Sequence, residues 1–299
     1  MNFSRAIQSL LACAICGGIF AVTGCISWEE GWKQAVKPTM KGDVKELFAK
    51  AERLEKTADT REGVRKVAAI YENIIAIEPE NFKALLALAD FNFLVGYFYS
   101  ESMDDKHAYY MKAVRYSEQA MYTNAKFRAR VDAGTPLWDA CDTLTKREVP
   151  AMYWWYCAAG NDWVQYRSAL TRLLTFSWPK RATRVLDAAL ALDPAWNGGD
   201  LYQAKAVYYA LAPGISGGDA TKAEAFFDKA IAAGPDRPNH LYMRALYWHV
   251  KNKNKEAFVK DLENIISRDP ARLNFPYPWA AAYQRMAKKN LNDINKYFY

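Results

Sequence analysis

One spacing pattern, found at four places, constrains the fold of this chain more than any other feature. Counting back from four prolines gives the same arrangement each time, with residues at steps of four and three and the last of them five positions before the proline. The copies are Val67-Tyr71-Ile74-Pro79, Ala182-Leu186-Ala189-Pro194, Ala223-Phe227-Ala230-Pro235 and Phe258-Leu262-Ile265-Pro270. Such steps place residues on one face of an α-helix, and the residue before a proline is pushed out of the helical region. The pattern therefore predicts four helices of one type, each ending close to its proline.

The same offsets resemble the second helix of a tetratricopeptide repeat, in which small and aromatic residues precede a closing proline. Ala113-x3-Ser117-x2-Ala120 is a degenerate copy that lacks the aromatic residue and the proline. From about Lys41 onward nearly every stretch has helical periodicity, and no run alternates with period two for long. We therefore expect an all-α fold over residues 41–299, made of antiparallel helical hairpins of degenerate tetratricopeptide-like repeats in a solenoid or bundle. A generic helical bundle is the alternative.

The N-terminus has the order of an export signal. Arg5 and the terminal amine come first, an apolar stretch follows from Leu10 to Val22, and a small-residue site closes the segment. Val22-Thr23-Gly24-Cys25 resembles the lipobox of bacterial lipoproteins, in which the thiol is acylated before cleavage on its N-terminal side. We expect residues 1–24 to be a lipoprotein signal peptide, Cys25 to carry the lipid, and residues 25–40 to be a lipidated tether. An uncleaved membrane anchor is less favoured because the apolar stretch is short for ~20 spanning residues.

Two consequences follow for location. Acyl chains contribute ~0.8 kcal/mol per buried methylene, so several chains on one residue would hold the protein to a membrane. Residue 26 is Ile rather than Asp, which by resemblance to proteobacterial sorting rules favours the periplasmic side of the outer membrane. Trp28 and Trp32 are four residues apart and could lie at the membrane interface on one helical face, or in a segment docked against the body.

The cysteine content and the net charge say little about the function of the chain. Cys13 and Cys16 would leave with the signal peptide, so only Cys141 and Cys157 would remain unmodified. They could form a disulfide in an oxidising compartment or remain buried free thiols. The net charge of +7 is spread along the chain, whereas nucleic-acid binding is typically marked by a concentrated basic stripe. We expect no nucleic-acid partner.

Three common catalytic and metal-binding motifs do not occur in this sequence, and its one CxxC motif, Cys13 to Cys16, lies in the expected signal peptide. His107, His240 and His249 include no pair at the HExxH spacing, and there is neither a G-x-S-x-G elbow nor a phosphate-binding loop. We expect no enzyme activity, metal or cofactor. Gly217-Gly218-Asp219 could present backbone amides to an anion, but Asp219 would repel it. We favour a structural loop, in which the glycines allow a left-handed turn and Asp219 caps the next helix.

Aromatic residues are the best candidates for a binding site. They gather on the presumed first helices of the hairpins, which line the inner surface of repeat arrays. A band of aromatic side chains there could form an apolar ligand channel, although core packing explains many of them equally well. The candidates are Tyr153, Trp154, Trp155, Trp163, Tyr166, Tyr202, Tyr208, Tyr209, Tyr242, Tyr247 and Trp248.

From Leu47 to Tyr299 the chain resembles a known family. The resemblance rests on the aromatic run 153–156 with residues 161–163, on segment 193–199, on Tyr208-Tyr209 with loop 217–219 and Lys222-Ala223, and on Ala287-x2-Asn290-Leu291. Together with a lipobox and degenerate helical repeats, these features are similar to the TatT component of TRAP transporter systems.

The resemblance implies a lipid-anchored helical protein that faces the periplasm. It would associate with a periplasmic TRAP solute-binding protein and help to handle a small hydrophobic or organic-acid ligand, without enzyme activity. Homo-oligomers with one pore per subunit are also implied, and a trimer is possible. The alternative function is a tetratricopeptide-like interaction scaffold in outer-membrane assembly. An enclosed, aromatic-lined cavity favours the transport function, and an open concave groove favours the scaffold.

Overall fold

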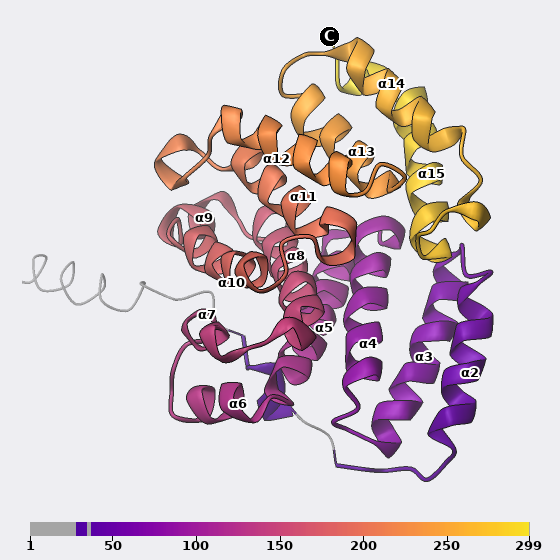
Figure 1. Ribbon diagram of the computed structural model, residues 1–299, viewed down its shortest axis with the longest axis vertical. Helices are drawn as coiled ribbons and strands as arrows, with labels where there is room; N and C mark the ends of the chain where they lie inside the picture. Colours follow the sequence, from indigo (N-terminus) through magenta and orange to yellow (C-terminus); the bar gives the residue numbers. More distant parts are fainter. Residues whose placement is uncertain (1–27, 35–36, 299) are drawn as a thin grey trace, which may run out of the picture.

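The computed structural model describes residues 28–34 and 37–298, and in these residues the chain forms helices and no strands (Figure 1). Fourteen α-helices, α2 to α15, follow one another along the chain. The prediction of an all-α fold is confirmed. The predicted signal peptide and Cys25 lie outside the described residues.

The helices are joined by short turns. The first seven are α2 (Val44–Glu55), α3 (Arg61–Ile77), α4 (Phe82–Leu94), α5 (Met103–Tyr122), α6 (Ala125–Asp132), α7 (Leu137–Ala140) and α8 (Val149–Gln165). The others are α9 (Ala169–Leu174), α10 (Trp178–Leu192), α11 (Trp196–Leu211), α12 (Ala220–Ala233), α13 (Pro238–Arg244), α14 (Lys255–Ile266) and α15 (Tyr277–Asn292). Two 3-10 turns, η1 (Gly31–Gln34) and η5 (Gly214–Ser216), and two π-helical turns, η2 (Val95–Tyr99) and η6 (Ala245–His249), matter for the site.

The repeated spacing pattern marks the buried faces of α3, α5, α10, α12 and α14. Every helical residue of the four copies, and of the degenerate copy in α5, is buried. The helices α3, α10 and α12 each end two residues before their proline, and α14 ends at Ile266, ahead of Pro270. Side-chain caps at Thr60, Asp219 and Asn254 start three of these helices. The pattern therefore identified the inward faces, while the relation to tetratricopeptide repeats stays an interpretation.

The array closes on itself because the last long helix packs against the first hairpins. The Trp279 indole on α15 donates a hydrogen bond to Asp90 on α4 over 2.6 Å. The same ring stacks on Trp154 of α8, with 5.5 Å between ring centroids. Phe98 and Tyr283 add an edge-to-face pair at 4.9 Å. These contacts join segments that are far apart in the sequence, so the helices surround a common interior.

The segment before α2 docks on the body. Trp28 packs against Trp155 and Trp178, and Trp32 stacks on Tyr122 with 5.9 Å between ring centroids. A Cβ on Gly31 would lie 2.4 Å from the Arg115 carbonyl oxygen, so only glycine allows η1 to approach α5 this closely. Of the two arrangements that the sequence left open for Trp28 and Trp32, residues 28–34 adopt the docked one.

Buried Glu118 on α5 holds this segment in place. Its carboxyl group accepts hydrogen bonds from the Trp28 and Trp155 indoles, each over 2.9 Å, and from the Gly31 backbone over 2.5 Å. Burial raises the pKa of Glu118 to about 7, and the three donors act in the opposite direction. The chain that leads to Cys25 is therefore fixed to the body at Trp28.

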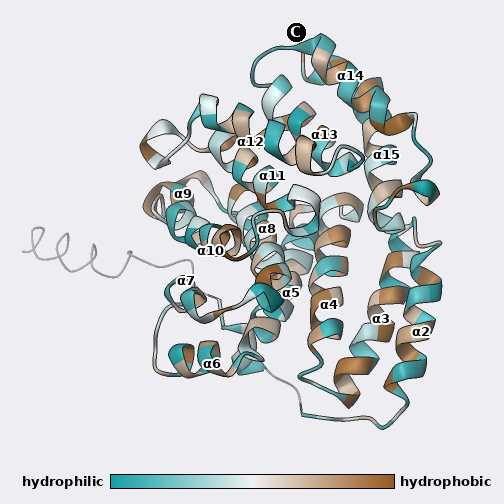
Figure 2. Cartoon of the chain, in the orientation of Figure 1, coloured by the Kyte–Doolittle hydropathy of each residue, from teal (hydrophilic) through white to brown (hydrophobic). Residues whose placement is uncertain are grey.

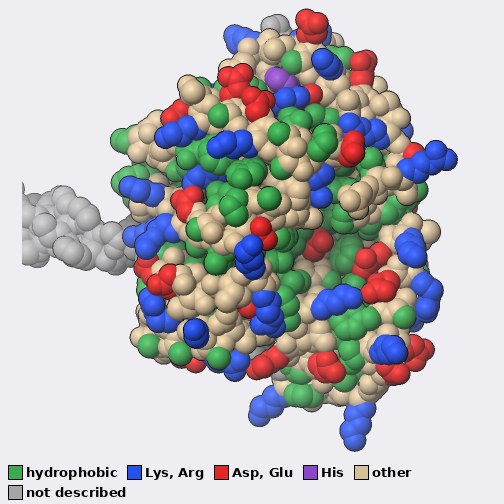
Figure 3. Space-filling view, in the orientation of Figure 1, with side chains coloured by type: hydrophobic (Ala, Val, Ile, Leu, Met, Phe, Trp, Pro, Cys, Tyr) green, Lys and Arg blue, Asp and Glu red, His purple; other side chains and the backbone are tan. Residues whose placement is uncertain are grey.

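The distribution of hydrophobic residues fits this helical body. In Figure 2 the outer helices α2 and α3 alternate between hydrophilic and hydrophobic bands, and in Figure 3 basic and acidic side chains are intermixed on the visible face. Among the described residues one helical stretch, Phe82–Tyr99, is long and apolar enough to cross a membrane, and 56% of it is buried inside the fold. This stretch comprises α4 and η2, which contribute to the hydrophobic core.

Candidate ligand cavity

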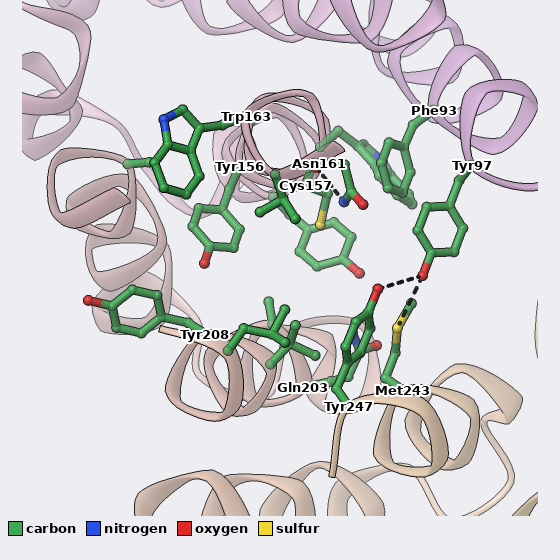
Figure 4. A pocket seen from close by; sticks show the side chains of 18 of the residues that line it. Phe93, Tyr97, Tyr156, Cys157, Asn161, Trp163, Gln203, Tyr208, Met243 and Tyr247 are labelled. Carbon is green, nitrogen blue, oxygen red and sulfur yellow. Dashed lines mark hydrogen bonds between the residues drawn. The ribbon is translucent and has the colours of Figure 1, made fainter. Parts of the chain in front are cut away.

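A cavity of about 610 Å³ lies in the interior that the helices surround. Its lining comes from α4 and η2, α8, the α9–α10 region, α11, α13 and η6, and α15 (Figure 4). Its volume falls in the range of ~300–1,000 Å³ that is usual for small-molecule sites. Aromatic side chains make up much of the wall, with a few polar groups among them.

Five of the eleven aromatic residues that the sequence singled out line this cavity. Three of them, Tyr153, Trp154 and Trp163, come from α8, while Tyr208 comes from α11 and Tyr247 from η6. Their contact with a ligand stays a prediction. The cavity brings these five residues together from three separate segments of the sequence.

The other six lie elsewhere. Buried Trp155 faces Trp28 and Glu118, and Tyr166 stacks on His107. Successive residues on a helix point ~100° apart, so an unbroken aromatic run cannot face one cavity with all its members. The remaining four do not line the cavity but pack against Phe226, Asn290 or other core residues, and they are Tyr202, Tyr209, Tyr242 and Trp248.

Sequence reasoning missed part of the aromatic lining. Tyr156 belongs to the same run as Tyr153, and its side chain points into the cavity with a hydroxyl that makes no hydrogen bond among the described residues (Figure 4). The others come from α4, η2, the α9–α10 region, α15 and the segment just before α15, outside the presumed first helices. They are Phe93, Tyr97, Phe176, Trp178, Phe275, Trp279 and Tyr283.

Two π-helical turns shape one wall. Tyr97 lies in η2 and Tyr247 in η6, and their hydroxyl oxygens are 3.2 Å apart (Figure 4). The Tyr97 hydroxyl also contacts the Met243 sulfur at 3.7 Å. A π turn inserts an extra residue and so rotates the following side chains, and such turns occur often at functional sites. Here the two turns place a pair of tyrosines against each other at the cavity wall.

Buried Asp200, in the first part of α11, organises the polar side of the cavity. Its carboxylate pairs with the Arg237 guanidinium at 3.0 Å and accepts a hydrogen bond from the Asn239 amide over 2.8 Å. His240 Nε2 lies 3.1 Å from the same carboxylate. The side-chain oxygen of Asn239 is buried and has no hydrogen-bond partner in the part of the chain that the structure describes.

An unusual turn places Asp200. Asn197, Gly198 and Gly199 all have positive φ angles, of 48°, 63° and 95°. A Cβ on Gly199 would lie 3.0 Å from Ala233 and 3.1 Å from the Ala230 carbonyl oxygen, so glycine is required by both conformation and space. The turn lets the Asn197 amide donate to Asp200 over 2.6 Å.

Asp90 is a second carboxyl group on the cavity wall. Burial raises the pKa of Asp90 to about 7, although the hydrogen bond from the Trp279 indole acts to lower it. Since the folded pKa lies above the unfolded value, protonation favours the folded state. The contribution of Asp90 to stability is therefore complete below pH ~4 and is lost as the pH rises through about 7.

Asp90→Asn is expected to remove this pH dependence, because the amide stays neutral and its carbonyl can still accept from Trp279. As the pH rises from 5 to 8, the unfolding free energy of the variant is expected to increase by about 2 kcal/mol relative to that of the wild type. Urea denaturation of both proteins at the two pH values measures the gain. Glu118 also titrates in this window, but it does so equally in both proteins. If the difference in unfolding free energy between the two proteins were the same at pH 5 and pH 8, the raised pKa of Asp90 would be contradicted.

The predicted structural loop borders the cavity mouth. Gly217 has a φ of 94°, and the Asp219 side chain accepts a hydrogen bond from the Lys222 backbone over 3.0 Å at the start of α12. That hydrogen bond lowers the pKa of Asp219. The Tyr208 hydroxyl donates to the Ser216 carbonyl, and both residues line the cavity. The loop is thereby tied to the aromatic wall.

Cys141 and Cys157 are both free thiols, and burial raises the pKa of each. Cys157 lies on the cavity wall. Among residues 28–34 and 37–298 there is no group of three His, Cys, Asp or Glu side chains that could hold a metal ion.

A comparison with protein families identifies the chain. A family model described as TAtT, TRAP transporter T-component, matches residues 102–298. The chain belongs to the TRAP transporter T-component family. The resemblance noted from the sequence is thus confirmed, and the family supports an accessory role in TRAP transport. No protein of curated function matched the chain. The T-component match begins at the start of α5, yet α4 and η2, which precede it, supply Asp90, Phe93 and Tyr97 to the cavity.

Proposed function

We propose that this T-component is a lipid-anchored accessory protein that holds or relays a small hydrophobic or organic-acid ligand in its cavity. It acts together with a periplasmic TRAP solute-binding protein, on the periplasmic side of the outer membrane, where Cys25 carries the anchor. Assembly as a homo-oligomer, with a trimer possible, belongs to the same proposal. The observation that carries the ligand-binding part is the aromatic cavity with a cluster of polar groups on one side.

The lining defines the kind of ligand that fits. Stacked aromatic rings such as Trp154 and Trp279 offer an apolar surface to a hydrocarbon or ring system. Arg172, which also lines the cavity and pairs with no carboxylate among the described residues, is a cation that can attract a carboxylate. A molecule with an apolar body and one polar end matches this arrangement.

The closed array argues against the scaffold function. Scaffolds built from helical repeats bind partners along an open concave surface. Here α15 packs against α4 and α8 through Trp279, and the interior is occupied by the cavity. The contacts that close the array therefore favour ligand binding.

Gly160→Trp tests the cavity directly. Gly160 lies on α8 among cavity-lining residues, on the same helical face as Tyr153, Cys157 and Val164. A Cβ there would meet no atom within 4 Å, so the indole is expected to occupy the cavity without disturbing the fold. The variant is expected to bind a dansyl-labelled long-chain carboxylic acid about tenfold or more weakly, a loss of ~1.4 kcal/mol. Titration of dansyl fluorescence measures this.

Gly160→Ala is the matched control. It adds one methyl group to a helix interior, so it is expected to raise the unfolding free energy by about 0.5–1 kcal/mol and to leave binding of the probe nearly unchanged. Equal probe affinity in the wild type and in a folded Gly160→Trp variant would show that the probe binds elsewhere. Absence of probe binding to the wild type would contradict the proposed ligand class.

A further inference from the structure

Large hydrophobic side chains are exposed along one edge of the molecule. Leu173 on α9 is 69% exposed and Ile215 in η5 is 94% exposed. Contiguous exposed apolar surface of this kind usually marks an interaction site. We call this surface the apolar edge, and it consists of Val164, Leu170, Leu173, Leu174, Phe176, Leu211 and Ile215. In Figure 3 hydrophobic side chains gather where Figure 1 shows α9 and the loop between α11 and α12.

The apolar edge surrounds the mouth of the cavity. Val164, Leu173, Phe176 and Leu211 are exposed to solvent and also line the cavity. A surface that covered the apolar edge would therefore also cover the cavity mouth. Whatever binds the apolar edge would therefore control how a ligand enters the cavity.

The surroundings of the apolar edge are basic. Between Trp163 and Leu186 the chain contains five cations and no Asp or Glu. Two of these cations, Lys180 and Arg181, are exposed and form no ion pair with a carboxylate among the described residues. The five are Arg167, Arg172, Lys180, Arg181 and Arg184. Exposed Leu and Phe next to Lys and Arg are the combination that binds an anionic lipid surface.

The docked segment 28–34 places Trp28 beside the apolar edge. The Trp28 ring packs against Trp178, with 6.5 Å between ring centroids. Trp178 begins α10, two residues after Phe176, and it lines the cavity. Cys25 precedes Trp28 by three residues, so the lipid attachment point can lie no more than ~11 Å from the Trp28 backbone. Glu118 fixes Trp28, so an anchor at Cys25 leaves the body little freedom to turn the apolar edge away from the membrane.

We propose that the apolar edge lies in the surface of an anionic lipid bilayer and that the cavity mouth opens into it. Leu173, Phe176 and Ile215 enter the boundary between headgroups and acyl chains, while Lys180 and Arg181 contact the anionic headgroups. This deepens the proposed function and rests on it for the ligand: the cavity takes an amphiphile directly from the bilayer. A second copy of the chain or a soluble protein on the apolar edge is the contrary outcome.

The test uses the full, lipidated chain anchored in vesicles. An environment-sensitive fluorescent amino acid replaces Leu173 in one protein and Leu54, an exposed residue of α2, in a matched control. In vesicles of phosphatidylethanolamine and phosphatidylglycerol, the probe at position 173 is expected to shift its emission to the blue and to be quenched by nitroxide-labelled lipid. The probe at position 54 is expected to keep the emission of a side chain in water.

A charge reversal tests the role of the cations. Lys180→Glu with Arg181→Glu is expected to abolish most of the emission shift at position 173 on these vesicles. The same reversal on α2, Lys45→Glu with Lys50→Glu, is expected to leave the shift intact. Water-like emission at position 173, equal shifts at both positions, or a blue shift without quenching by labelled lipid would each overturn the proposal. Binding of the dansyl probe in solution is measured separately, so failure of membrane contact is distinguishable from failure of ligand binding.

Discussion

Trp155→Ala is expected to lower the free energy of unfolding by about 3–5 kcal/mol, which is the usual cost of truncating a buried tryptophan. The Trp155 side chain is almost fully buried and packs against Trp28 and Trp178, and its indole donates to Glu118. The substitution therefore opens a large void between α8 and the N-terminal segment. Urea denaturation followed by circular dichroism measures the loss.

The neighbouring residue provides the matched comparison. Trp154 lines the cavity and is only partly buried, so Trp154→Ala is expected to cost less stability and to weaken binding of the dansyl probe. Trp155→Phe keeps most of the packing and is expected to leave the affinity for the probe unchanged. If Trp155→Phe weakened binding as much as Trp154→Ala, the assignment of these two side chains to the core and the cavity would be wrong.

Asp200→Ala is the second variant with a large expected effect, again a loss of about 3–5 kcal/mol in unfolding free energy. The substitution removes the partner of the largely buried Arg237 guanidinium and the acceptor for the Asn197 and Asn239 amides. An unpaired cation and unsatisfied donors in the interior are costly because water cannot replace the lost partner. Denaturation by urea, monitored at constant pH, measures the loss.

Asp200→Asn separates charge from hydrogen bonding. Its amide oxygen can still accept from Asn239, but it no longer neutralises Arg237, so the variant is expected to lie between the wild type and Asp200→Ala. A loss below about 1 kcal/mol for Asp200→Ala would be typical of a solvent-exposed ion pair. That result would contradict the organising role of Asp200 on the polar side of the cavity.

The helices were predictable because their signal is local. Steps of three and four residues before a proline mark the buried face of a helix such as α12 without knowledge of its neighbours. The same local information cannot tell which buried face meets the core and which meets a cavity. Trp154 and Trp155 are adjacent in sequence and differ only in their rotation about the axis of α8, which depends on where the other helices lie.

No short sequence pattern predicts that the helical array closes or that the polar cluster around Asp200 forms. Asp90 and Trp279 are separated by 189 residues, and their hydrogen bond depends on the path of every helix between them. Asp200, Arg237 and Asn239 also come from different helices and connections. The turn that places Asp200 belongs to segment 193–199, which is part of the family resemblance in the sequence. Only the fold shows that this turn positions the Asp200 carboxylate.

Native mass spectrometry of the intact, processed protein tests the central claim most directly. If the cavity holds a small amphiphilic ligand, wild-type protein purified in mild detergent is expected to carry one ligand-sized mass per chain. The same mass is expected to be absent from the folded Gly160→Trp variant and present in Gly160→Ala. A wild-type protein without any bound mass after purification and incubation with vesicle lipid, or an equal bound mass in Gly160→Trp, would contradict the claim that this T-component acts through its aromatic cavity.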